Sequence, residues 1–288
     1  MAVPARPLPD TPAPSRGPAA VTASPLSEAY TRLSGVYPGL TVLEGEPRSG
    51  GGWVTSAELA AGGAALDAFL GWDEDQVLRD YGEPGRPDVV AGFGLHRYVW
   101  PACLLVTVPW FLLRRVPRLP VGQVSLDRAR GRMTVRVTEF RCLPDDPAAA
   151  LPGARVVPDE EGLRDAVREA VAEHVGPVLD AFRRRTRRGT RALWGMVADD
   201  ITEGLWRIGA LLGEEDRALT ELAGLLPSAV TPYPVGAGFR ELTGPDGDRL
   251  VTRDRAACCL FYTLRPRETC ATCPRTCDTE RIRRQIAS

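Results

Sequence analysis

Residues 98–113 read Tyr98-Val-Trp-Pro-Ala-Cys-Leu-Leu-Val-Thr-Val-Pro-Trp-Phe-Leu-Leu113, the most apolar stretch of the chain. It is shorter than the about 20 residues that a helix needs to cross a bilayer. Pro101 and Pro109 interrupt it, and arginines stand on both sides. We therefore expect a buried core segment, broken at its prolines, against which the other elements pack. Contact of this segment with a membrane surface is the alternative that the flanking arginines leave open.

Helical patterns dominate the sequence downstream of this segment. Apolar residues recur every three or four positions from Asp159 to Phe182, which predicts a helix that Pro177 kinks or splits. The same spacing predicts a second long helix over 194–212. A third runs from 214 or 215 to 226, before Pro227.

Shorter elements are predicted on the amino-terminal side and between the long helices. Thr55 and Glu58 form a capping-box pattern ahead of a helix over 56–70, which Gly62 and Gly63 weaken. The remaining predictions are a helix over 27–33, a strand over 40–43, strands over 122–126 and 133–140 around the turn 127–131, and a hairpin turn at 244–247. Together these elements predict an α+β fold, predominantly helical with a small β component.

The amino-terminal and carboxy-terminal segments differ from the rest in composition. Residues 1–26 are rich in Pro and Ala and lack a basic start followed by an apolar run, so we expect a disordered arm, no secretory signal and a cytoplasmic protein. We expect one domain over 27–247 and a small metal-bearing subdomain over 248–288.

The charged residues exclude several kinds of chemistry. The chain has 36 basic and 37 acidic side chains, and a net charge of -1 does not indicate a nucleic acid as partner. Every basic residue is Arg, so phosphate-loop lysines and lysine Schiff bases are excluded. The two histidines, His96 and His174, are too few for a multi-histidine metal site, and we expect both to be structural.

The cysteines are concentrated near the carboxy terminus. Cys103 and Cys142 are isolated, and we expect them to be buried apolar residues. The other five are Cys258, Cys259, Cys270, Cys273 and Cys277. Such a cluster, in a chain expected to be cytoplasmic, indicates metal binding rather than a disulfide framework, although disulfides stay an alternative.

The spacing narrows the choice of metal. A Cys-x-x-Cys unit presents two soft thiolates from one turn, which suits zinc, copper(I) or an iron–sulfur cluster. Adjacent cysteines are awkward for a single zinc ion, because consecutive side chains diverge. They suit better a [2Fe–2S] cluster, which needs two ligands on each iron. Arginines outnumber acids over 251–288, and a positive surrounding favours a cluster that becomes more negative on reduction. A structural zinc site remains the alternative.

The segment RAACCLFYTLRPRETCATCP, residues 255–274, resembles the carboxy-terminal signature of the FhuF-type ferric-siderophore reductases. RYVWPACLLVTVPW and RALWGMVADDITEGL are similar, more loosely, to the core segment and a helix of the same family. The resemblance implies that Cys258, Cys259, Cys270 and Cys273 ligate a [2Fe–2S] cluster. Cys277 lies outside the pattern, and we expect it to be auxiliary or incidental.

The resemblance also implies an activity. The cluster would transfer one electron to Fe(III) held by a hydroxamate siderophore, in the cytoplasm or at the inner face of the membrane. Because no dinucleotide or flavin motif is present, the electron would come from an external donor, either a ferredoxin-like protein or a flavin reductase. Two alternatives are a zinc-stabilised binding module and an iron–sulfur sensor without reductase activity.

Arginines 183, 184, 185, 187 and 188 form the densest basic run of the sequence. Cations at the end of a helix complement the negative end of its dipole, so the run is expected first as a solvated helix terminus. The functional alternative is a docking patch for an acidic ferredoxin or an anionic lipid surface.

Overall fold

The apolar segment forms the central helix of the protein, α4 (Pro87–Leu113), in a computed structural model that describes residues 24–266, 268–270 and 272–286. The expected interruption was wrong, because the helix is continuous through Pro101 and Pro109. Proline removes a helical hydrogen bond. Here α4 is covered by other helices and buried over most of its length, and this packing holds the helix together.

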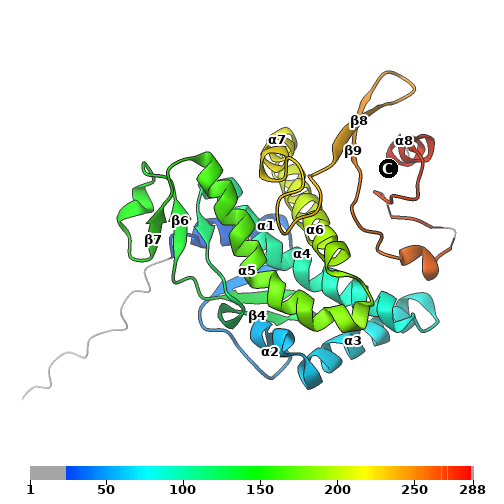
Figure 1. Ribbon diagram of the computed structural model, residues 1–288, viewed down its shortest axis with the longest axis horizontal. Helices are drawn as coiled ribbons and strands as arrows, with labels where there is room; N and C mark the ends of the chain where they lie inside the picture. The colour runs from blue at the N-terminus through cyan, green and yellow to red at the C-terminus, as the bar shows by residue number, and fades with distance from the viewer. Residues whose placement is uncertain (1–23, 267, 271, 287–288) are drawn as a thin grey trace, which may run out of the picture.

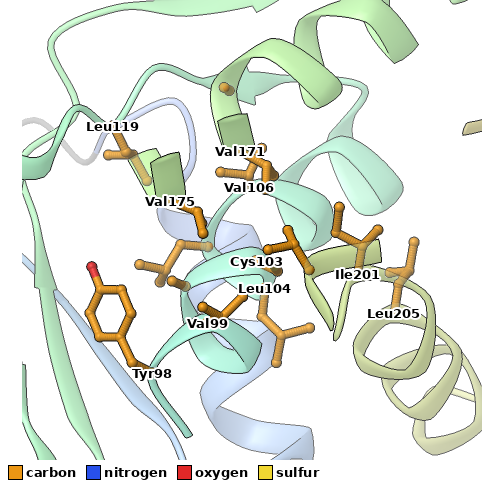
Figure 2. Close-up of a cluster of buried hydrophobic side chains, with 14 of the residues drawn as sticks. Tyr98, Val99, Cys103, Leu104, Val106, Leu119, Val171, Val175, Ile201 and Leu205 are labelled. Atoms are coloured by element: carbon orange, nitrogen blue, oxygen red, sulfur yellow. The ribbon is translucent and has the colours of Figure 1, made fainter. Parts of the chain in front are cut away.

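The expectation of a buried core segment is confirmed. Among the described elements, α4 is long and apolar enough to cross a membrane, but 72% of its most apolar window is buried inside the protein. The close-up in Figure 2 shows Tyr98, Val99, Cys103 and Leu104 of α4 among side chains of the neighbouring helices. A helix that is apolar on all sides is typical of such a central position.

Two long helices pack against α4 on different sides (Figure 1). They are α5 (Glu160–Thr186) and α6 (Thr190–Leu211), both close to the predicted ranges. The side chain of Asp159 accepts a hydrogen bond from the amide of Gly162, which caps the start of α5. The helix runs unbroken past Pro177, so the predicted split was wrong. The third predicted helix is α7 (Glu215–Leu225).

Three of the described helices precede α4 in the chain. The capping box of Thr55 and Glu58 is confirmed at the start of α2 (Ser56–Ala61). The glycines do more than weaken the predicted helix, because Gly62 and Gly63 both have positive φ angles and separate α2 from α3 (Gly63–Tyr81). The first helix, α1 (Ser27–Val36), begins where it was predicted. Of these three helices, α1 and α3 pack against α4, whereas α2 packs against α5.

Strands form small sheets beside this helical body. One sheet has the order β1-β5-β4-β2, with β1 and β5 parallel and the other pairs antiparallel; a second has the order β3-β6-β7. The predicted strand over 133–140 is two strands in different sheets, β5 and β6. The bounds are β1 Thr41–Glu44, β2 Trp53–Thr55, β3 Val116–Pro117, β4 Val124–Asp127, β5 Arg132–Val135, β6 Phe140–Cys142 and β7 Ala154–Val156. Short 3₁₀ turns lie at Val121–Gln123, Arg128–Arg130, Pro147–Ala150 and Phe261–Thr263. The mixed α+β fold is thus as predicted.

The cysteine segment joins a hairpin to the last helix. The hairpin consists of β8 (Phe239–Thr243) and β9 (Arg249–Arg253), joined by the predicted turn. The last helix is α8 (Asp278–Ile286). In Figure 1 this part lies beyond α6 and α7, on the side of the molecule away from β6 and β7.

The predicted arm over 1–26 lies mostly outside the described residues, which begin at Ser24. Its last residue, Leu26, is fully buried and belongs to the main hydrophobic core. The packed part of the chain therefore begins earlier than residue 27.

Candidate metal centre

The four cysteines of the predicted site lie in two loops of the carboxy-terminal segment. Cys258 and Cys259 follow β9, and Cys270 and Cys273 precede α8. The Sγ atoms of Cys259 and Cys270 are 3.8 Å apart, so the structure brings together one thiol from each loop. Cys273 is buried and the other three are half-buried. The site is therefore close to the protein surface.

The remaining two cysteines share a local geometry. The amide of Leu260 donates to the Sγ of Cys258, and the amide of Arg275 donates to the Sγ of Cys273, both at 3.4 Å. Leu260 has a positive φ of 63°, an uncommon conformation for a side chain with a branched γ carbon. In each loop an amide two residues after the cysteine thus donates to its sulfur, which stabilises negative charge on a thiolate.

The thiols of Cys259 and Cys270, which lie in contact, share one proton more readily than they hold two. The hydrogen bond that the two thiols share lowers the pKa of Cys259 to about 6 and raises the pKa of Cys270. Arg255, whose Nη1 is 3.8 Å from the Sγ of Cys270, also favours the charged form. The pair therefore loses its first proton near neutral pH and holds the second tightly. The thiolate is the form that binds metals.

A buried carboxylate of α6, which the sequence analysis missed, fixes the start of the first cysteine loop. Asp199 is fully buried and accepts hydrogen bonds from the amides of Ala256 and Ala257, both at 3.0 Å. The same carboxylate pairs at 2.6 Å with Arg253, whose side chain is also fully buried. The central helix bundle thus holds the backbone just before Cys258. Two consecutive acids on a mostly apolar helix were the signal in the sequence.

The second loop is held from two sides. Glu203, one turn after Asp199 on α6, accepts a 2.5 Å hydrogen bond from the hydroxyl of Thr272 and pairs with Arg253 at 3.1 Å. From the other side, the buried guanidinium of Arg281 on α8 donates to the carbonyls of Arg253 at 2.9 Å and Cys273 at 3.1 Å. Arg281 therefore ties the last cysteine of the pattern to β9. No pattern in the sequence separates Arg281 from the other arginines.

The other three cysteines lie elsewhere. Cys277 is exposed just before α8, in agreement with its position outside the pattern. Cys103 and Cys142 are buried in hydrophobic clusters, as predicted. Burial raises the pKa of both thiols, so both are protonated and unreactive at neutral pH.

The two histidines differ in their surroundings. His174 is structural, as expected: its Nδ1 lies 2.6 Å from the carbonyl of Leu119 and its Nε2 2.8 Å from the hydroxyl of Tyr98. Burial lowers the pKa of His174 to about 4. His96 has a partly exposed side chain, paired through Nδ1 at 2.6 Å with the buried Asp200, whose negative charge raises the pKa of His96. His96 also lines a cavity beside the cysteines.

The chemistry of the donor set fits a thiolate-bound cluster. Two thiols are adjacent, two more receive amide hydrogen bonds, and a guanidinium lies beside them. Within residues 24–266, 268–270 and 272–286, no three His, Cys, Asp or Glu side chains are gathered closely enough to hold a metal ion. The pair of Cys259 and Cys270, rather than the full set of four, is therefore in contact.

Comparison with known proteins agrees with this chemistry. No curated protein sequence matches the chain. Residues 255–275 match the family described as the FhuF 2Fe-2S C-terminal domain. The matched range includes all four predicted ligands and excludes Cys277. The match identifies this segment as similar to the FhuF 2Fe-2S C-terminal domain and indicates a [2Fe–2S] cluster as its cofactor.

Proposed function

We propose that the protein is a ferric-siderophore reductase, which transfers one electron to Fe(III) held by a hydroxamate chelate in the cytoplasm. Fe(III) is a hard cation that hydroxamate oxygens bind tightly, and Fe(II) is held far more weakly by the same donors. A single electron therefore suffices to release the metal. The observation that carries the proposal is the FhuF 2Fe–2S match over the cysteine loops, beside which a cavity opens.

The four residues that would hold the cofactor are Cys258, Cys259, Cys270 and Cys273. When bound, a [2Fe–2S] cluster supplies a one-electron carrier. The amides of Leu260 and Arg275 and the guanidinium of Arg255 stabilise negative charge on the sulfurs. Because reduction adds negative charge, these groups favour the reduced state and raise the potential.

The electron donor would dock on a basic surface beside the site. Arg188 donates to the carbonyl of Cys258 at 2.6 Å, so the junction of α5 and α6 touches the first cysteine loop. Arg183, Arg184 and Arg187 at this junction are exposed and form no direct ion pair within the described part of the chain. Their position at the end of α5 also complements the helix dipole. Three unpaired cations next to the cluster loop favour an acidic, ferredoxin-like donor over a neutral flavin reductase.

The first experiment determines the cofactor. Protein purified without oxygen should be coloured and contain iron and acid-labile sulfide in equal amounts, and reduction should bleach the visible absorption. Colourless protein with stoichiometric zinc would instead support a zinc-stabilised binding module. Cys277→Ser is the matched control for each of the four cysteine variants, because it removes a thiol of the same segment from outside the pattern.

The second experiment tests the activity. Reduced protein, freed of excess reductant, is mixed with a ferric trihydroxamate and a ferrous chelator under nitrogen. We expect one Fe(II) for each reduced cluster. If the cluster stays reduced while Fe(III) remains chelated, the protein is an iron–sulfur sensor and the proposed activity is wrong.

A further inference from the structure

A cavity of about 530 Å³ opens beside two of the predicted cluster ligands, Cys259 and Cys270. Its other walls come from α4, which contributes Phe93 and His96, and from α6, which contributes Asp200, Glu203 and Trp206. The volume lies within the range of about 300–1,000 Å³ that is typical of small-molecule sites. The cavity is thus large enough for a ligand beside the cysteines.

Two polar atoms of the wall, Oδ2 of Asp200 and Nε of Arg255, have no hydrogen-bond partner in the part of the chain that the structure describes. Asp200 is 1% exposed, and its Oδ1 is paired with Nδ1 of His96. The other carboxylate oxygen, Oδ2, is buried and has no hydrogen-bond partner among the described residues. A buried acceptor without a donor is unfavourable, so its presence in a cavity wall indicates where a donor from a ligand would bind.

The charges around the cavity disfavour a strongly anionic ligand. Arg255 is already surrounded by acids, with its Nε 3.5 Å from Asp199 and 3.6 Å from Glu203. Asp200 and Glu203 balance the cations of the wall, so no excess of positive charge remains. Three singly charged hydroxamates neutralise Fe(III), whereas three doubly charged catecholates leave the complex a trianion. The wall therefore matches a neutral or cationic complex better than a trianionic one.

The rest of the lining suits the organic shell of such a complex. Trp206 is partly buried; its ring packs edge-on against Phe239 and its indole N–H donates to Glu215. Trp206 and Phe93 provide apolar surface on the two helices that form the walls. Apolar walls with a few fixed polar groups are the usual composition of a ligand site.

Given the proposed function, we propose that this cavity binds the ferric chelate next to the cluster, and that Asp200, oriented by His96, selects neutral or cationic trihydroxamates through a hydrogen bond to a ligand N–H. The same placement accounts for how the electron reaches the metal, because two cluster ligands line the cavity that would hold the substrate.

Gly92 offers a way to fill the cavity without disturbing the fold. It lies within α4 and lines the cavity, and a Cβ at this position would meet no atom within 4 Å. Leucine is a better helix former than glycine, so Gly92→Leu should fold and project its side chain into the cavity. The control is Gly71→Leu, inside α3, where a Cβ also has open space outside this cavity.

The test measures binding rather than reduction. The probe is the gallium(III) complex of desferrioxamine B, which carries a positive charge and cannot be reduced like iron, titrated calorimetrically into anaerobic, cluster-loaded protein. Gly92→Leu should weaken binding at least tenfold and Gly71→Leu should not change it. Asp200→Asn, which keeps the shape of the cavity, should weaken binding of this cation about tenfold and reduce its preference over a gallium tris-catecholate.

The outcomes separate this inference from the proposed activity. Unchanged affinity in both Gly92→Leu and Asp200→Asn would overturn the inference, even if the protein releases Fe(II) from ferric hydroxamates. If Gly92→Leu lowers the iron content, its affinity is not informative, and the affinity of Asp200→Asn alone tests the inference. Tight binding that both variants weaken, without Fe(II) release by the parent protein, would support the cavity as the chelate site and refute the reductase activity.

Discussion

The most informative single substitution is Asp199→Asn, because this carboxylate joins the helical body to the first cysteine loop. It is fully buried, pairs with the fully buried Arg253 and accepts the amides of Ala256 and Ala257. Asparagine has nearly the same shape, but it carries no charge and has one acceptor oxygen instead of two. The substitution therefore removes electrostatic and hydrogen-bonding interactions and leaves the packing almost unchanged.

The expected cost follows from these contacts. Losing the charge from the bond with Arg253 costs about 1.5–3 kcal/mol, and one backbone amide left without an acceptor costs about 1–3 kcal/mol. Glu203 remains 3.1 Å from Arg253 and compensates part of the buried positive charge. We therefore expect the free energy of unfolding to fall by about 3 kcal/mol, at the lower end of the range for broken buried ion pairs.

The assay is urea unfolding of the metal-free chain at neutral pH, followed by far-ultraviolet circular dichroism, together with iron and sulfide content after reconstitution. The control is Asp67→Asn, which breaks an exposed ion pair with Arg185 and should cost less than about 1 kcal/mol. We expect Asp199→Asn to reduce cluster content as well as stability. If Asp199→Asn lowers the free energy of unfolding no more than the control does and its iron content is normal, the role of Asp199 as the anchor is refuted.

The remaining predictions concern the cluster, the pH dependence of folding and the electron donor. Replacing Cys258, Cys259, Cys270 or Cys273 singly by serine should remove most of the iron and sulfide, measured per chain. Cys277→Ser should retain both. Because burial lowers the pKa of His174 to about 4, below its ordinary value of 6.5, the unfolded chain takes up this proton first as the pH falls. Stability should thus decline between about pH 6.5 and 4, by about 2 kcal/mol at pH 5, and urea unfolding should show a weaker pH dependence for His174→Gln. The exposed arginines of the α5–α6 junction are neutralised in the variants Arg183→Gln, Arg184→Gln and Arg187→Gln. These variants should slow reduction by an acidic ferredoxin in stopped-flow experiments and reduce the salt dependence of its rate, but leave reduction by dithionite unchanged. The control Arg155→Gln, on β7, should have none of these effects.

Local signals predicted most of the elements, and packing decided where those predictions were wrong. The capping box and apolar periodicity depend on a few neighbouring residues, so they located the starts of α2 and α5 to within one residue. The expected breaks at Pro101, Pro109 and Pro177 did not form. The local cost of a proline is fixed, but its compensation comes from tertiary contacts, which the sequence does not show. Gly62 is the opposite case, where a backbone conformation that only glycine favours does end a helix.

The candidate site was predicted only in part, for a related reason. Cysteine spacing is a local pattern, and it indicated the four candidate ligands; the FhuF match supports the same segment. The groups that hold the loops come from distant positions, since Asp199 lies 58 residues before Ala257. Asp199 and Asp200 stand out as consecutive acids on a mostly apolar helix, but their spacing does not show what Asp199 binds. Nothing in the sequence distinguishes Arg281 from the other arginines near it. Such partners emerge only when α6 and α8 are packed against the cysteine segment.

The contacts that hold the carboxy-terminal cysteine segment bear on whether it can fold without the helical body. Few of its apolar side chains are buried; Ala257, Leu264 and Cys273 are among them. Its position depends instead on Asp199 and Glu203 of α6 and on the arginines that they bind. The boundary predicted between residues 247 and 248 falls in the turn of the β8–β9 hairpin, between strands that are paired with each other. Because buried ion pairs stabilise only when both partners are present, we expect the segment to need the helical body for its structure. The cluster site and the cavity on α4 and α6 are thus parts of one packed unit, in which the same helix positions both the cysteines and the wall facing them.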